Sequence, residues 1–485
     1  MNLNFLKTFA PTCADFISIL PETLLICAAL LVFLLSTIFT SKVGDRILSI
    51  FSLLLIFIVM TVGLFLDYYD IITLEYSFGN MLAPTGPFTY FAFLCALLTG
   101  AMAYRYLKKN PSQYKSEYYG VLMICLASMC IFVRAENLIL FFVALECMTI
   151  AFYALISWSR HSSICLAGSI KYMIISGVSG AICLLGIVFI YGASLKANVD
   201  FLYFANFSLA SSSKLFYIGM LLVFASVLFK LGAFPFQFWI SDVYQAAPNP
   251  TTSFLAIASK ASALFVIFNL VDNLNITSEK LYVIACVIAS ITILVGNLPA
   301  LVQKNTKRLM ALSGVSNTGY LLILICAVLK MQELRESVFL VMSFYLLSYA
   351  FATYAVFIVM NLYRDADDSK QCIDDYRGML HKDKVATASL SIALASLAGI
   401  PPTAGFFAKL FVIIVAWQAA LYVPLAIMIA GSVMSIYYYF AWMRATYNSS
   451  ENCEYKFGSS KSAMVVLLAL SATTLVFGIS SIYIF

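Results

Sequence analysis

Charged residues are scarce in this sequence: Asp, Glu, Lys and Arg make up 11% of the 485 residues, whereas 62% are hydrophobic and the mean hydropathy is +0.95. This shortage excludes a soluble protein, because the surface of a soluble chain carries far more charge. The sequence also lacks the ten-residue alternation of barrel strands and any hydrophilic stretch long enough for a separate domain. Apolar runs of about 20 residues, long enough to cross a bilayer as helices, are present instead. The sequence therefore predicts an all-α polytopic membrane protein.

The twelve cysteines include no C-x-x-C pair, which excludes the clustered thiolates of an iron–sulfur site. The net charge of +6 would suggest a nucleic-acid partner in a soluble protein. Here the basic residues lie mostly in short segments between apolar runs, where they act as topology signals. We therefore expect no nucleic-acid partner, and no cofactor or metal bound by this chain.

The apolar runs, read between turn residues and charge clusters, predict fourteen helices. If the N-terminus lies outside, eighteen Lys and Arg residues fall in inner loops and seven on the outer side, so the positive-inside rule places both termini outside. The first run is too long for the apolar core of a signal peptide and is expected to stay as the first helix. The predicted spans are 18–39, 46–66, 86–107, 117–134, 136–157, 166–191, 215–244, 251–270, 281–302, 307–329, 337–363, 386–418, 421–446 and 462–484.

Two of these helices, the seventh and the twelfth, carry helix breakers in mid-span: Gly232 and Pro235 in one, and Gly399, Pro401 and Pro402 in the other. Proline removes a backbone donor and clashes with the preceding turn, so both helices should break. In a membrane such a break survives only when it is packed in protein or lines a wet cavity.

The two breaks are five helices apart, which predicts two inverted repeats of opposite orientation. The predicted segments are 1–116 with three helices, 117–270 with helices 4–8, 271–446 with helices 9–13, and 447–485 with the last helix. Two independent proline kinks are the alternative interpretation.

Five ionisable residues lie in the interior of predicted spans, away from the charges at the span ends: Glu146, Lys171, Lys230, Lys260 and Lys409. A charge in mid-bilayer costs from about 2.5 to well over 10 kcal/mol, so each is a candidate functional group. Burial disfavours the ammonium form of lysine and a nearby carboxylate restores it, which makes a lysine able to take up and release a proton.

Simpler roles remain open for two of these residues. Lys171 lies only about six residues into its span and could extend to the inner interface, and Glu146 could be a static partner for a lysine. Asp242, near the inner end of the seventh helix, is interpreted as an interfacial or helix-orienting group.

Several long motifs resemble the antiporter-like membrane subunits of proton-pumping NADH:ubiquinone oxidoreductase, respiratory complex I. The stretch 230–260, KLGAFPFQFWISDVYQAAPNPTTSFLAIASK, is similar to the signature of the seventh and eighth helices of that family. The stretches DYRGML at 375–380 and SLAGIPPTAGFFAK at 396–409 are similar to its twelfth-helix signature, and KRLMALSGVS at 307–316 to its tenth. The opening ILPETLL at 19–25, the length and the lysine at 409 resemble subunit 2 in particular.

The resemblance implies a role for each membrane charge. Glu146 and Lys171 would sense the neighbouring channel, Lys230 would be the central pump lysine, Lys260 the connecting lysine and Lys409 the outlet. The family often has a histidine in the tenth helix, where this chain has Asn317. An amide can hold water but carries no proton, so Asn317 is a candidate polar relay.

The resemblance also implies a setting. Flavin, iron–sulfur clusters and quinone would belong to other subunits of the translocase, and the partners would be further antiporter-like subunits, small membrane subunits and anionic lipids such as cardiolipin. The alternatives are a subunit of an independent cation/proton antiporter, or a structural membrane-arm subunit without its own proton channel. The cysteine content and the Phe- and Tyr-rich composition favour the mitochondrial inner membrane, with both termini in the intermembrane space; the alternative is a bacterial plasma membrane.

Overall fold

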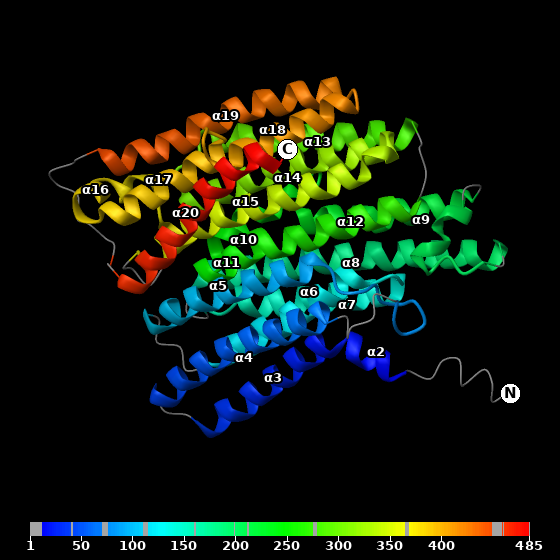
Figure 1. The fold of residues 1–485 in the computed structure, drawn as a ribbon, viewed down its shortest axis with the longest axis horizontal. Coiled ribbons are helices and arrows are strands. Elements are labelled where there is room, and N and C mark those ends of the chain that lie inside the picture. Colours follow the sequence, from blue (N-terminus) through cyan, green and yellow to red (C-terminus); the bar gives the residue numbers. More distant parts are fainter. Residues whose placement is uncertain are drawn as a thin grey trace. The chain divides into compact units, whose positions relative to one another are not determined.

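A computed structural model describes residues 12–39, 42–69, 76–109, 115–159, 162–197, 199–210, 213–274, 279–363, 368–448, 458 and 460–484. Over these ranges the chain is helical, with isolated β-bridges in place of strands (Figure 1). The first eleven residues of the predicted N-terminal segment lie outside the described part. The chain divides into two compact units, of which the first comprises 1–158, 172–227 and 261–275, and the second 159–171, 228–260 and 276–485.

The predicted number of membrane helices is confirmed. Thirteen helices within the described ranges are long and apolar enough to cross a membrane. Two shorter apolar helices, α17 (Lys384–Ala398) and α18 (Ala404–Gln418), fill the predicted twelfth span and together supply a fourteenth crossing. The division into repeats at 117–270 and 271–446 stays a prediction, because the compact units follow contacts and not repeat boundaries.

The first unit is built around the packing of α3 on α4 and α6, and of α6 on α7. An ion pair fixes one end of it: Arg134 Nη1 donates to Glu22 Oε1 at 2.6 Å, and both side chains are buried. Its helices are α2 (Cys13–Ser18), α3 (Leu20–Ile38), α4 (Lys42–Tyr68), α5 (Pro87–Lys109), α6 (Glu117–Arg134), α7 (Leu138–Ile156), most of α8 (Ser163–Ala197), η1 (Phe204–Ala210), most of α9 (Lys214–Leu231) and nearly all of α12 (Lys260–Leu274).

The predicted boundary between the fourth and fifth spans is confirmed, and its local cause is a cap. Ala135 and Asn137 adopt extended backbone conformations, which end α6. The Asn137 side chain then accepts a hydrogen bond from the N–H of Ile139 at 2.9 Å, satisfying a free donor in the first turn of α7. A single amide side chain therefore separates two helices that the hydropathy pattern leaves nearly continuous.

The second unit has α14 at its centre, packed on α13 and contacted by α10, α15, α18 and α19. Nearly every residue of α14 is buried, including the polar Ser313, Ser316 and Asn317. Its elements, besides α17 and α18, are η2 (Gln237–Trp239), α10 (Ile240–Ala246), α11 (Asn249–Phe254), η3 (Leu255–Ser259), α13 (Glu279–Ala300), α14 (Thr306–Lys330), η4 (Gln332–Leu334), α15 (Arg335–Asn361), η5 (Asp368–Lys370), η6 (Ile373–Tyr376), α16 (Met379–Lys382), α19 (Tyr422–Tyr447) and α20 (Lys461–Ile484).

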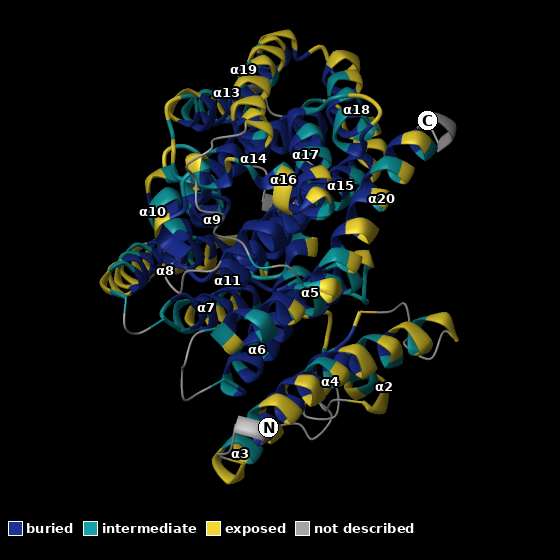
Figure 2. Cartoon of the chain, turned by 90° about the vertical axis from the view of Figure 1, so that its left-hand side faces the viewer, coloured by how far each residue is buried: buried dark blue, intermediate teal, exposed yellow. Residues whose placement is uncertain are grey.

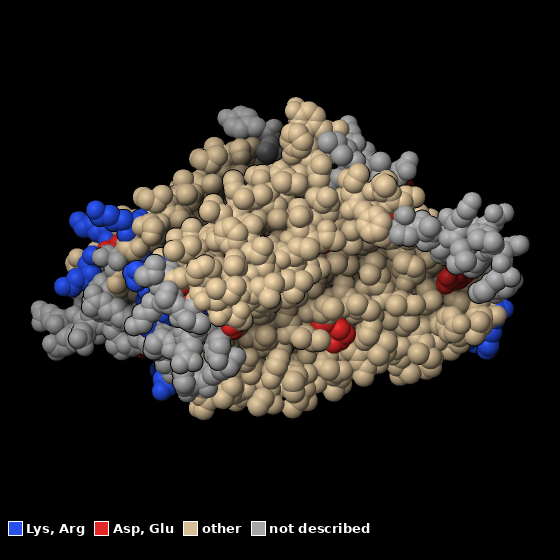
Figure 3. Space-filling view, turned by 90° about the horizontal axis from the view of Figure 1, so that it is seen from below, with Lys and Arg blue, Asp and Glu red and all other residues tan. Residues whose placement is uncertain are grey.

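Exposed apolar side chains cover the outer faces of several helices. Figure 2 shows exposed residues along α4 and α19, and these include Phe57 and Phe65 on α4 and Val433 and Tyr437 on α19. On the face drawn in Figure 3, Lys and Arg side chains gather toward the two ends of the view, and uncharged side chains fill most of the middle. Apolar surface on this scale fits contact with lipid and with other membrane helices.

Candidate functional site

The first predicted break is confirmed between α9 and α10. Gly232 has φ +62°, and a Cβ placed there would lie 1.6 Å from Ile240 Cδ1, so only glycine fits. The N–H of Phe234, freed from the helix ladder, donates to Thr292 Oγ1 on α13 at 3.0 Å, and Pro235 follows. The freed donor is therefore satisfied by a neighbouring side chain, as a break within a membrane requires.

Lys230 lies in the last turn of α9, directly before this break, and is only 4% exposed. The carbonyl groups at the C-terminal end of a helix carry partial negative charge, which favours a cation there. The break therefore places a buried lysine at a helix end, where a positive charge is favoured.

The second predicted break is confirmed at Gly399, which ends α17 in the left-handed region with φ +85°; Pro401 and Pro402 precede α18. Lys409 on α18 is 7% exposed and reaches back to the broken end. Its ammonium donates to the carbonyl oxygens of Leu397 at 3.0 Å and Ala398 at 2.9 Å. The ammonium group thus supplies hydrogen-bond donors to the last carbonyl groups of α17, which have no partner within the helix.

Lys260 follows a π-helical turn, η3, at the start of α12 and is 5% exposed. Its ammonium has no hydrogen-bond partner among the described residues; the Tyr244 ring centroid lies 6.0 Å away. A Cβ built on Gly314 of α14 would lie 2.9 Å from Nζ and 3.1 Å from the Tyr349 hydroxyl. A π-turn re-aims the side chains that follow it and is common at functional sites.

Lys171 belongs to a half-exposed ion cluster in the second unit. It pairs with Asp242 on α10, and Arg308 on α14 donates through Nη2 to the other carboxylate oxygen at 2.9 Å. The three side chains are 37%, 36% and 38% exposed, so Lys171 is the most solvent-accessible of the four lysines. This placement supports the interfacial interpretation of Asp242, and the cluster links α10 to α8 and α14.

Glu146 lies in the middle of α7 in the first unit and is half-buried. Its carboxylate lies against Gly180 of α8: a Cβ built on that glycine would be 2.3 Å from Oε1. Among the described residues no group of three or more His, Cys, Asp or Glu side chains is arranged to hold a metal ion.

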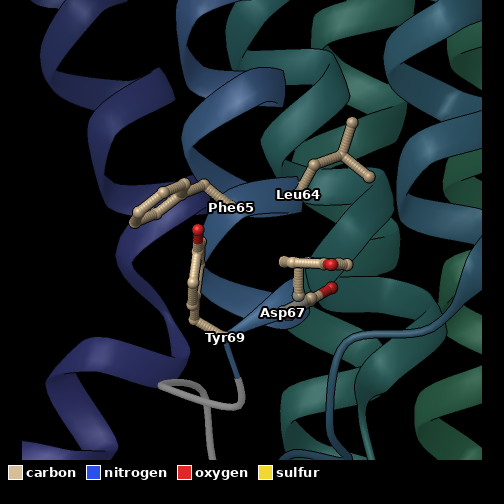
Figure 4. Close-up of a pocket in the computed structure, with 5 residues that line it drawn as sticks. Leu64, Phe65, Asp67 and Tyr69 are labelled. Carbon is tan, nitrogen blue, oxygen red and sulfur yellow. The ribbon is translucent and has the colours of Figure 1, made fainter.

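A surface pocket at the end of α4 is separate from these charges. Leu64, Phe65, Asp67, Tyr68 and Tyr69 line it, and none of the five membrane charges does so (Figure 4). The Asp67 carboxylate is already engaged by hydroxyl groups of Thr85, at 2.8 Å, and Tyr90. This pocket is therefore not treated as part of the site.

Comparison with known proteins identifies the family. Residues 135–435 match the family described as NADH:quinone oxidoreductase/Mrp antiporter, TM. The chain is 41% identical over 343 residues to NADH-quinone oxidoreductase subunit N 1 of Opitutus terrae, covering 68% of this chain and 67% of the relative. The chain belongs to the antiporter-like membrane subunits of NADH:quinone oxidoreductase, as a subunit N.

Two further likenesses extend over more of the chain. NADH-quinone oxidoreductase subunit N of Dehalococcoides mccartyi is 31% identical over 420 residues, covering 84% of this chain and 85% of the relative. A chain of the respiratory complex I structure from Thermus thermophilus with bound aureothin matches with a TM-score of 0.76 at 23% identity, over 95% of this chain and 97% of that one. At 23% identity, the likeness to the Thermus thermophilus chain shows a shared fold only.

Asn317 of this subunit N lies on α14 with both ends of its amide engaged. Its Oδ1 accepts from the Tyr345 hydroxyl at 2.7 Å, and its Nδ2 donates to the Ser313 carbonyl at 2.9 Å. A second amide, Asn297 on α13, accepts from the Tyr438 hydroxyl at 3.1 Å. The sequence alone gave no reason to select Asn297 or the tyrosines, because an isolated amide or hydroxyl in an apolar run is common.

Two buried ion pairs were missed from the sequence. Lys307, counted as an inner-loop charge, is fully buried in the first turn of α14, where its ammonium lies 2.8 Å from Asp368 Oδ1. Arg134, counted as an outer charge, is likewise buried with Glu22. The available signal in both cases was a basic residue at the very end of an apolar span; the acidic partner lies at the start of a span for Glu22 and in the segment after a span for Asp368.

Proposed function

We propose that this subunit N is the non-redox, proton-translocating antiporter-like subunit of an NADH:ubiquinone oxidoreductase. Protons move through a relay that includes Glu146, Lys171, Lys230, Lys260 and Lys409, coupled to quinone reduction elsewhere in the complex. The observation that carries this proposal is the burial of three ammonium groups, those of Lys230, Lys260 and Lys409, within membrane helices, two of them beside the helix breaks. Ionisable groups so placed are typical of proton pathways.

The proposed roles differ with the surroundings of each side chain. Lys260 has three donors and no fixed acceptor among the described residues, which suits a group that exchanges protons with mobile water or hydroxyl groups. Lys409 is held by two backbone carbonyls at a helix break, which suits an outlet group that must stay in place. Lys171, in contact with Asp242 and half-exposed, is suited to the interface with solvent or a neighbouring subunit.

The proposed setting is a respiratory membrane, with both termini on the outer side. The relatives described above come from bacteria, which favours the bacterial plasma membrane over the mitochondrial inner membrane. We further propose that flavin, iron–sulfur clusters and quinone are bound by other subunits. Its partners would be further antiporter-like and small membrane subunits, together with anionic lipids such as cardiolipin.

The test is to replace Lys230 by Ala in the assembled complex and to measure protons translocated per NADH oxidised. We expect assembled complex with a reduced ratio, because the central acceptor is lost. Lys214→Ala is the matched control, since Lys214 is an exposed lysine at the start of the same helix, α9, and should leave the ratio unchanged. Lys409→Met provides a second buried variant if Lys230→Ala does not assemble. An unchanged ratio in both buried variants would refute proton transfer through this subunit.

A further inference from the structure

The carboxylate of Glu146 occupies the space that a side chain at position 180 would need. A Cβ built on Gly180 would lie 2.3 Å from Oε1, 3.1 Å from Cδ and 3.6 Å from Oε2, and these are its three nearest neighbours. Real Cβ atoms do not approach other atoms to 2.3 Å. The glutamate can therefore lie against α8 at this point only because residue 180 has no side chain.

The same stretch of α8 is lined with small polar groups. Ser179 Oγ donates to Ser226 Oγ on α9 at 3.1 Å, and Cys183 is buried on the same face of α8. Cys183 and the fully buried Tyr172 both lie within electrostatic reach of Glu146. Residues 172, 179, 180 and 183 thus share one face of α8, and the Glu146 carboxylate lies at the glycine of that face.

We infer that Gly180 is a positioning residue for Glu146: its missing side chain sets where the carboxylate lies within the membrane. This inference rests on the proposed function, in which Glu146 takes part in charge coupling. Because the atoms that a methyl group would meet belong to the flexible end of one glutamate, Gly180→Ala should displace the carboxylate and leave the packing of α7 and α8 intact.

The alternative role for a membrane glycine is close helix packing, and α8 contains an example of it. A Cβ on Gly186 would lie 2.7 Å from the backbone oxygen of Gly219 on α9, so Gly186→Ala must push two helices apart. Gly177 gives the opposite case, because nothing lies within 4 Å of a Cβ built there. Alanine substitutions at these three glycines of one helix therefore distinguish three effects. The first displaces a carboxylate, the second disturbs helix packing, and the third changes only the helix propensity of the residue.

The experiment is to introduce Gly177→Ala, Gly180→Ala and Gly186→Ala into the full complex and to measure the amount assembled and the protons translocated per NADH oxidised. We expect Gly177→Ala to match the parent in both and Gly186→Ala to reduce assembly. Gly180→Ala should assemble normally but translocate fewer protons per NADH oxidised, because a misplaced group transfers protons more slowly.

A rescue variant distinguishes positioning from a general structural effect. Glu146→Asp withdraws the carboxylate by one methylene group, which makes room for the new methyl. The Gly180→Ala, Glu146→Asp double variant should therefore lose less pumping than the two single losses combined. Three outcomes would each overturn the inference. The losses of the two single variants could be additive, Gly180→Ala could pump like Gly177→Ala, or Gly180→Ala could fail to assemble like Gly186→Ala.

Glu146→Gln separates this inference from the proposed function. If Glu146→Gln pumps normally, the proposed role of Glu146 is wrong whatever position 180 does. If Glu146→Gln abolishes pumping while Gly180→Ala has no effect, the proposed function stands and only the positioning role of Gly180 is lost.

Discussion

The buried ion pair between Lys307 and Asp368 should make the second unit strongly dependent on both charges being present. Lys307 Nζ lies 2.8 Å from Asp368 Oδ1 and also donates to the Ala247 carbonyl at 2.8 Å. The other oxygen of Asp368 accepts from the backbone N–H of Asn249 at 3.0 Å. One carboxylate therefore holds together the start of α14, the turn between α10 and α11, and η5.

Replacing Asp368 by Asn keeps the shape of the side chain and removes its charge. The Lys307 side chain is fully buried and cannot reach water, so its ammonium would stay in the interior without a counter-charge. Breaking a buried pair in this way costs about 3–5 kcal/mol. That is a large part of the total stability of about 5–15 kcal/mol typical of folded proteins.

Asp374→Asn is the matched control, because it removes the same charge from an exposed pair. Asp374 lies 2.5 Å from Arg377, and the two side chains are 60% and 46% exposed. Solvent screens such pairs, and their contribution is about 0–1 kcal/mol.

The assay is the amount of assembled complex and the temperature at which half of its activity is lost. We expect Asp368→Asn to lower both clearly and Asp374→Asn to leave them unchanged. Adding Lys307→Met to Asp368→Asn should restore much of the loss, because an apolar replacement removes the uncompensated charge. If Asp368→Asn is as stable as Asp374→Asn, the reasoning about the buried charge is wrong.

Two further predictions concern a loop carboxylate and a second glycine. Burial, together with nearby Asp272, raises the pKa of Glu136 from 4.5 to about 7. The folded protein thus keeps a proton that the unfolded chain loses, and stability falls as the pH rises from about 4.5 to 7. Glu136→Gln should flatten that part of a thermal-stability profile, and an unchanged slope would contradict the assignment. Gly314→Ala, whose methyl would meet the Lys260 ammonium, should lower pumping in assembled complex, whereas Gly86→Ala, with open space around it, should not.

Helix number and both helix breaks could be predicted from the sequence, because each has a direct physical signal. Apolar runs of spanning length are unambiguous in a chain with so little charge. Gly232, Gly399 and their neighbouring prolines interrupt the helix for reasons internal to the backbone. The boundary before α7 was predicted on three polar residues, and the cap made by Asn137 shows why they sufficed.

Side-chain direction at the ends of spans could not be predicted. Lys307 and Arg134 were counted as loop charges because hydropathy places a residue along the membrane normal and says nothing about the side of the helix on which it lies. Both turn into the protein and pair with an acid distant in sequence, Asp368 and Glu22. The π-turn before Lys260 has no sequence signal either, since residues 255–259 are ordinary helix formers.

Four buried cations of this subunit, Arg134, Lys307, Lys260 and Lys409, fall into two kinds that differ in how well they suit the proposed proton transfer. Arg134 and Lys307 each form an ion pair with a carboxylate, at 2.6 Å and 2.8 Å. Lys260 and Lys409 pair with no carboxylate within the described ranges; one has no hydrogen-bond partner there and the other is held by carbonyl and hydroxyl oxygens. Loss of a proton from these two leaves no buried anion behind, so their protonation can change without breaking an ion pair. In the proposed relay, Lys260 and Lys409 are therefore better suited to exchange protons than Arg134 and Lys307, whose ion pairs join parts of the fold.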